Sequence, residues 1–261
     1  GTNNICSSDS SYGNNIIFGN QNTNSGNGRC NFITGNFNTL TTKVNANFIN
    51  GDSNTIQDVT PITAFSATSY ATFISGISNI ATGCSYSSIL GCYHHVSDVQ
   101  DSLIVGSQVT ANNAKHSIIW GNELNASNVF SSFVGGHQNN IRYIDFSSIL
   151  GTGITVIGTS ESTLKNCFAC GTYLTLLNDN EAALGTRNIS TLKTESIAGT
   201  IFSIGNGSAT RPTGVYNALE VRSNDAIYIS SGTNIETNSQ ILLQDFIGTP
   251  MTESEINAIL I

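Results

Sequence analysis

Cysteine is the first residue type in this chain whose spacing could support chemistry. The six cysteines are Cys6, Cys30, Cys84, Cys92, Cys167 and Cys170, and only Cys167-x-x-Cys170 forms a close pair. A zinc site needs a second such pair or suitably spaced histidines, and a thioredoxin-like site needs the pair to open a helix after a strand. Neither context surrounds Phe168-Ala169, so we interpret the cysteines as small apolar residues of a core.

Histidines and carboxylates give no catalytic pattern either. His94, His95, His116 and His137 show no recognised ligand spacing. Gly205-x-Gly207 lacks the third glycine of a dinucleotide site, so it is interpreted as a turn. Asp98 and Asp101 are close in sequence, but a solvated edge explains them better than an acid–base pair. The sequence therefore predicts no catalytic residue, no metal site and no cofactor, and we expect a protein that is not an enzyme.

An internal repeat dominates the sequence. Nine short segments of similar type end in a glycine: Gly19, Gly35, Gly51, Gly76, Gly91, Gly106, Gly121, Gly136 and Gly151. Successive spacings are 16, 16, 25, 15, 15, 15, 15 and 15 residues, and Gly171 and Gly185 continue the series less regularly. A fixed period of this kind is typical of a solenoid.

Positions relative to the repeat glycine follow a rule. Isoleucine or valine stands two residues before it in all nine units, and a small polar residue stands four before it: Asn15, Asn31, Asn47, Thr72, Ser87, Ser102, Ser117, Ser132 and Ser147. A second apolar residue or alanine follows about five residues after it, at Leu40, Ile56, Ala81, Val96, Ala111, Ala126, Ile141 and Val156. About fifteen residues with two apolar points suit one coil of a β-solenoid, with glycine at a sharp corner.

Side-chain alternation along a strand divides these positions between two faces. The residue two before the glycine should point into the coil, and the small polar residue at minus four should satisfy backbone groups at a corner. Position minus three should point outward, yet it is apolar at Ile16, Phe32, Phe48, Phe73, Leu103, Ile118 and Phe133. A stripe this long should be buried, so we expect a homotrimer around a central axis.

Composition limits the function. Charged residues make up 10% of the 261 residues, hydrophobic residues 39%, and the net charge is −8. The few basic residues are scattered, which argues against nucleic-acid binding. No apolar run is long enough to span a membrane, so we expect no membrane insertion. A surface of hydroxyl and amide groups suits sugar ligands.

The unit [NS]-x-[IV]-x-G at a period of fourteen to sixteen residues resembles the left-handed parallel β-roll of trimeric autotransporter adhesin heads (YadA-like), a roll that recurs in bacteriophage tail fibres. The resemblance covers about residues 14 to 156, with a looser continuation to about 195. The residue before the glycine, often alanine in the adhesin heads, varies here from Phe18 to Trp120. The resemblance implies an all-β homotrimeric fold and a role in attachment.

The C-terminal part has a different pattern. Residues 199 to 235 alternate apolar and polar side chains and resemble the strand-rich module near the ends of phage tail fibres. Met251 to Leu260 predicts a short helix with a Thr252-x-x-Glu255 capping box. We therefore divide the chain into a β-roll shaft or head (1–198), a β-hairpin module (199–240) and a terminal segment with a short helix (241–261).

Two irregular spacings mark candidate binding loops. The first implies an insertion of about ten residues, roughly 57–68, and the second a shorter one near 159–163; insertions in solenoids form loops, often on the binding face. The candidate receptor-binding residues are Asp58, Thr60, Phe65, Tyr70 and Trp120. The competing interpretations are that the inserted segment is a surface loop without a binding role, and that Trp120 is a packing residue.

The sequence thus predicts a receptor-binding segment of a bacteriophage tail fibre, located on the virion, whose partners are its own copies, other tail or fibre proteins and a bacterial surface glycan or protein. The alternative is the head of a bacterial trimeric autotransporter adhesin at the cell surface. A polysaccharide depolymerase would need clustered carboxylates, an acyltransferase coil would need about eighteen residues, and an ice-binding solenoid would need a regular Thr-x-Thr ladder. None of these three patterns is found.

Overall fold

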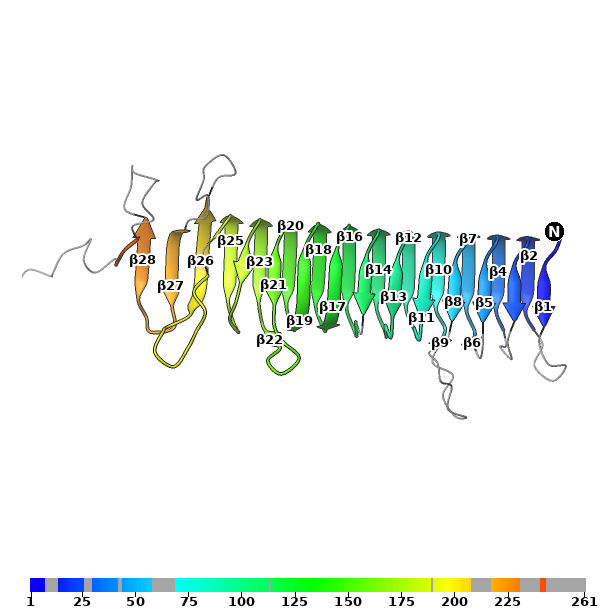
Figure 1. Cartoon of the computed structure of the whole chain (residues 1–261), viewed down its shortest axis with the longest axis horizontal. Coiled ribbons are helices and arrows are strands. Elements are labelled where there is room, and N and C mark those ends of the chain that lie inside the picture. Colours follow the sequence, from blue (N-terminus) through cyan, green and yellow to red (C-terminus); the bar gives the residue numbers. More distant parts are fainter. Residues whose placement is uncertain are drawn as a thin grey trace, which may run out of the picture.

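The chain winds into a rod of stacked coils built from two parallel sheets that share one core (Figure 1). The structure, a computed structural model, describes residues 1–7, 14–25, 30–41, 44–57, 69–112, 114–188, 190–207, 217–230 and 240–242. Within these ranges all regular structure is β-strand. The predicted all-β solenoid is therefore confirmed. The predicted helix at Met251 to Leu260 lies outside the described residues.

Each coil contributes one short strand to the first sheet, here called sheet A. Its twelve strands are β1 (Ile5–Ser7), β3 (Thr23–Ser25), β5 (Thr39–Thr41), β8 (Thr55–Gln57), β11 (Ile80–Thr82), β13 (His95–Ser97), β15 (Thr110–Asn112), β17 (Asn125–Phe130), β19 (Asn140–Asp145), β21 (Thr155–Ile157) and β24 (Thr175–Leu176), with β22 (Leu164–Lys165) beside β19. A separate pair joins β6 (Val44–Asn45) to β9 (Ser69–Tyr70).

The longer strand of each coil lies in sheet B, which has fifteen strands. They are β2 (Ile16–Asn20), β4 (Phe32–Asn36), β7 (Phe48–Asp52), β10 (Phe73–Ile77), β12 (Ser88–Cys92), β14 (Leu103–Ser107), β16 (Ile118–Asn122), β18 (Phe133–His137), β20 (Ser148–Thr152), β23 (Phe168–Thr172), β25 (Ala182–Thr186), β26 (Thr200–Asn206), β27 (Asn217–Arg222), β28 (Ile227–Ser230) and β29 (Gln240–Leu242). From β26 onward the strands pair antiparallel, as the hairpin prediction for residues 199 to 235 expected.

Glycine pairs with glycine from coil to coil along β2 to β26 of sheet B. Gly106 pairs with Gly121, for example, and the series extends to Gly185 opposite Gly205, beyond the segment that the sequence pattern covers best. At Gly106 φ is +137°, and a Cβ there would overlap the carbonyl oxygen of Gly121. The glycine is therefore required twice, for the left-handed backbone and for the close approach of the next coil.

The core is the column of aliphatic residues two before the glycine, facing the second apolar column of sheet A. Ile104 and Ile119 are fully buried, as are Val96 and Ala111 across the coil. The predicted interior is therefore confirmed. Full burial of a large aliphatic side chain stabilises the fold by about 1.5–3 kcal/mol, so one branched side chain per coil is a main source of stability.

The small polar column at minus four lies at a corner, as predicted. The Ser87, Ser102 and Ser117 hydroxyls each donate 2.8 Å to the backbone carbonyl two residues earlier. Each hydroxyl also accepts a hydrogen bond from the backbone N–H of the serine in the next coil, at 3.2–3.3 Å. The column thus satisfies buried backbone groups that the sharp corner would otherwise leave unpaired.

A second polar column, three residues after the glycine, was not anticipated. Its members are Asn22, Asn38, Asn54, Asn79 and His94. In each asparagine the side-chain oxygen accepts the backbone N–H of the next member, at 3.0–3.1 Å. Buried apolar Val109 and Leu124 interrupt the column, and Asn139 resumes it, with its side-chain oxygen accepting the backbone N–H of Ile154 at 2.9 Å.

Cysteine burial corrects part of the sequence interpretation. Cys84 and Cys167 are buried, and burial raises the thiol pKa of Cys84 to about 12 and of Cys167 to about 11. Cys6, Cys30 and Cys170, however, are exposed, so the prediction that they belong to the core is wrong. Cys167 and Cys170 lie three positions apart, and strand alternation turns the first inward and the second outward.

Candidate functional site

The outer face of sheet B carries many large apolar side chains. Here this name means the side chains three and one before each repeat glycine on strands β2 to β25. Several are large and exposed, including Ile16, Phe18, Phe73, Ile118, Trp120 and Phe168. Single exposed apolar residues are ordinary, but a contiguous stripe marks an interaction surface.

Aromatic rings stack along the first part of this face. Phe32 and Phe48 lie 5.1 Å apart between ring centroids with planes at 6°, and Phe48 and Phe73 lie 4.9 Å apart with planes at 14°. Phe18 meets Phe32 at 5.9 Å in a tilted arrangement. The in-register pairing of β4, β7 and β10 places these rings, because identical positions in successive coils lie one strand spacing apart.

In several coils a large side chain in one outward column is paired with a small one in the other. Phe48 is paired with Asn50 in its coil, while Ser148 is paired with Leu150. Phe133 is paired with Gly135, and the indole of Trp120 from the previous coil covers that glycine so closely that a Cβ there would overlap it. In this coil the ring of Trp120 thus fills the space that the side chain missing at Gly135 leaves open.

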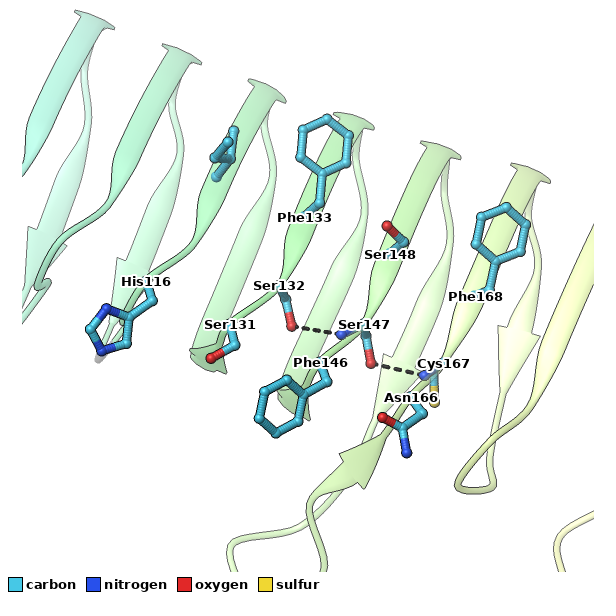
Figure 2. Close-up of a pocket in the computed structure, with 11 residues that line it drawn as sticks. His116, Ser131, Ser132, Phe133, Phe146, Ser147, Ser148, Asn166, Cys167 and Phe168 are labelled. Carbon is cyan, nitrogen blue, oxygen red and sulfur yellow. Dashed lines mark hydrogen bonds between the residues drawn. The ribbon is translucent and has the colours of Figure 1, made fainter.

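A groove of about 590 Å³ runs beside this face between β16 and β23. Its walls are the corner residues His116, Ser131, Phe146 and Asn166 on one side and Ile118, Phe133, Ser148 and Phe168 on the other (Figure 2). Figure 2 shows the rings of Phe133 and Phe168 on either side of Ser148, while the ring of Phe146 extends from the corner on the opposite side. The groove therefore presents mainly apolar ring surface.

Hydroxyl groups at the base of the groove are already hydrogen-bonded to backbone groups. The Ser132 Oγ accepts the Ser147 N–H, and the Ser147 Oγ accepts the Cys167 N–H, both at 3.0 Å (Figure 2). These groups belong to the polar corner column. A ligand here would find ring faces and the rim groups of His116 and Asn166 rather than a polar floor, so the groove fits apolar contact better than polar recognition.

Charge is sparse around the groove. His116 Nδ1 lies 3.5 Å from an Asp101 carboxylate oxygen, with both side chains well exposed. Exposed pairs of this kind contribute little stability. Across the described ranges, no three His, Cys, Asp or Glu side chains gather closely enough to hold a metal ion.

The outer face of sheet A has a contrasting chemistry. Its outward residues are mostly hydroxyl or amide, with Thr23, Thr39 and Thr55 in register on successive coils. Ile80 and His95 then interrupt the threonine column. The described strands therefore hold a short threonine column but no continuous Thr-x-Thr ladder, as the sequence suggested.

Of the five predicted receptor-binding residues, the structure describes Tyr70 and Trp120, which lie in different sheets. Asp58, Thr60 and Phe65 lie outside the described residues. Tyr70 belongs to β9, whose backbone pairs with β6, and Trp120 belongs to β16 in sheet B. The sequence analysis did not identify Phe146, Phe168 or Asn166, although their repetition at fixed offsets before the glycine was a usable signal.

Among the described residues no helix is long and apolar enough to cross a membrane. The sequence matches no family model, and no curated protein matches it.

Proposed function

We propose that this chain is a rigid segment of an attachment fibre of the bacteriophage tail-fibre kind, displayed on a virion, which self-associates into a homotrimer and contacts a bacterial surface. The observation that carries the proposal is the apolar outer face of sheet B, with its exposed rings. A monomeric shaft has no use for a row of exposed rings along its length, whereas a symmetric assembly buries it.

The size of that face supports self-association. Eleven parallel strands, β2 to β25, form it, and at about 4.8 Å per strand the face is roughly 50 Å long. With two outward side chains per strand, it offers several hundred Å² per copy, approaching the roughly 800 Å² per partner of a standard interface. Two or more copies could therefore be held by this surface.

Charge on the face is compatible with self-contact. None of the residues three or one before the glycine on β2 to β25 is charged. Identical copies would meet there without like charges, whose juxtaposition would cost several kcal/mol. A homotypic contact therefore needs no compensating ion pairs.

The rod form suits attachment. Backbone groups are paired along the whole stack, so strand edges are confined to the ends. The hydroxyl- and amide-rich surface stays soluble over a range of salt and pH because it depends little on charge. These properties are what a stiff spacer between a particle and a cell needs.

Solution mass tests the proposal. Sedimentation equilibrium at micromolar concentration should give about 83 kDa, three times the 27.6 kDa of one chain. Phe48→Lys should dissociate the assembly, because Phe48 lies in the ring stack. Thr55→Lys, on the outer face of sheet A in the same coil, should leave the mass unchanged. A wild-type protein that sediments at 27.6 kDa contradicts the trimer.

Attachment itself requires a cell assay. Fluorescently labelled wild-type protein should bind to intact cells of at least one strain in a bacterial panel, and unlabelled protein should compete. The dissociated Phe48→Lys variant should bind more weakly, because it loses multivalency. Equal binding by trimer and monomer would show that assembly does not serve attachment.

A further inference from the structure

A second pocket lies near the end of the regular coils. It occupies about 510 Å³ between the turn that precedes β22 and the segment that leads into β26. Figure 1 shows these two loops, green and yellow, extending from the same edge of the rod. The turn is the shorter insertion predicted near residues 159–163. We call this cavity the loop pocket.

The first wall of the loop pocket is held by its own hydrogen bonds. The backbone N–H of Thr159 donates to the carbonyl of Ser162 at 2.9 Å, and the Ser162 N–H donates to the Thr159 hydroxyl at the same distance. Gly158 N–H donates to the carbonyl of Arg142 at 2.9 Å and ties the turn to β19. The turn is therefore preformed.

The second wall is fixed in the same way. Thr191 and Thr200 close the base of the segment, because Thr200 N–H donates to the Thr191 carbonyl at 3.0 Å and Thr191 N–H donates to the Thr200 hydroxyl at 2.8 Å. Within the segment, Ile197 N–H donates to the Thr194 hydroxyl at 3.0 Å. A preformed pocket binds without paying for loop ordering.

One buried asparagine anchors the second wall. Asn178 is 7% exposed, and it lines the pocket. Its Oδ1 accepts the Lys193 N–H at 2.7 Å, and its Nδ2 donates to the Thr191 and Thr200 carbonyls at 2.9 and 3.1 Å. Behind it, the buried Glu181 carboxylate accepts the Asn178 N–H at 3.0 Å. This network makes the pocket floor rigid.

The residues that line the loop pocket contribute similar amounts of polar and apolar surface. Polar groups come from Ser162, Asp179, Asn180 and Lys193, and Ser223 adds a hydroxyl. Apolar surface comes from Leu164, Leu177, Leu192 and Ile201, of which Leu192 is 55% and Ile201 37% exposed. The pocket therefore offers donors, acceptors and partly exposed apolar surface together.

We propose that the loop pocket binds a short neutral carbohydrate, one or two hexose rings. A pyranose ring carries hydroxyls on its rim and C–H groups on its faces, which matches a pocket lined by both polar groups and exposed leucine and isoleucine. The pocket volume falls in the usual range for small ligands, about 300–1,000 Å³. The inference rests on the proposed attachment function, because it supplies the class of surface receptor.

Self-association would leave this pocket open. None of its lining residues belongs to the outward columns of β2 to β25 that form the proposed interface. Each copy in an assembly would keep one loop pocket. Weak sugar sites repeated around one axis gain strength through multivalency.

Saturation-transfer NMR tests the inference with glucose, galactose and N-acetylglucosamine, each as monosaccharide and disaccharide at millimolar concentration. At least one sugar should receive saturation from the wild-type protein. Ser162→Arg should abolish the signal, because its side chain fills the pocket. Ser160→Arg is the matched control, since Ser160 is exposed on the same turn and does not line the pocket, and it should retain the signal.

The two proposals fail separately. A trimer by sedimentation that binds none of these sugars, or binds them equally after Ser162→Arg, overturns the loop-pocket inference and leaves the assembly standing. A monomer that binds a sugar in a Ser162-dependent way refutes the proposed assembly and supports the pocket. Circular dichroism of both arginine variants confirms that the β-structure is intact.

Discussion

The Nδ1 atom of His94 accepts a hydrogen bond from the backbone N–H of Val109 in the next coil, at 3.3 Å. The other ring nitrogen, Nε2, lies 3.1 Å from the carbonyl oxygen of Leu90. Nε2 must therefore carry the proton, and the ring is neutral. His94 thus occupies a position in the asparagine column and accepts the equivalent backbone hydrogen bond, but with a ring that can be protonated.

Acid should destabilise the rod through His94. Burial lowers the pKa of this imidazole below its usual value of about 6.5, so the unfolded chain binds the proton more readily. The stabilising contribution is complete above about pH 6.5 and is lost as the pH falls from there toward the lowered pKa, by up to about 1.4 kcal/mol per pH unit. Urea unfolding between pH 8 and pH 5 measures the loss.

His94→Asn should remove this acid sensitivity, because asparagine fills the same position at Asn79. His116→Asn replaces an exposed histidine and should leave the pH profile unchanged. If the wild type and His94→Asn weaken equally on acidification, the loss does not arise from His94.

Gly106→Ala should be strongly destabilising. The new Cβ would meet the Gly121 carbonyl, and the positive φ of +137° is unfavourable for alanine. Strain and overlap together should cost at least about 3 kcal/mol of unfolding free energy. Ser107→Ala, on the outward side of the same strand, should cost less than about 0.5 kcal/mol. Chemical denaturation of both variants gives the comparison.

Ser117→Ala should cost about 1–3 kcal/mol. The substitution removes the acceptor of the buried Ser132 N–H, at 3.3 Å, and the donor to the Lys115 carbonyl, at 2.8 Å. Ser117→Thr keeps the hydroxyl, and threonine already occupies this column at Thr72. Thermal melts should therefore place the threonine variant near the wild type. Equal losses for both would assign the effect to packing instead of the hydroxyl.

Gly135→Ala should move the ring of Trp120. A Cβ at Gly135 would overlap the indole, and Gly135 itself has no left-handed backbone to strain. Trp120 is the sole tryptophan of the chain, so its fluorescence reports directly on this site. We expect a red-shifted emission in the variant. Cys170→Ala, in the same outward column several coils away, should leave the spectrum unchanged.

The repetitive part of the fold could be predicted from the sequence because each coil repeats the same physical requirements. The glycine predicted the corner, the branched residue two before it predicted the core, and the serine four before it predicted the polar column. Gly106, Ile104 and Ser102 form one such set. The asparagine column was overlooked because it lies outside the apolar segments, although Asn38 and Asn54 recur three residues after their glycines.

The unique parts of the molecule could not be predicted in this way. The loop pocket depends on Asn178 meeting Lys193 and Thr200, contacts that arise only from the path of two loops that occur once. Likewise, Glu220 is fully buried and accepts a 2.6 Å hydrogen bond from Thr200 because β27 reverses direction against β26. No period in the sequence signals such pairings.

Because the glycines of successive regular coils pair in the same register, the length of the rod can change without changing the structure of each coil. Between Gly76 and Gly151 each coil has fifteen residues and the same pairing as its neighbours. Removing or duplicating one whole coil would join equivalent corners and shorten or lengthen the shaft by about 4.8 Å. The length that the rod spans could therefore change during evolution by whole coils, while the residues at its two ends stay the same.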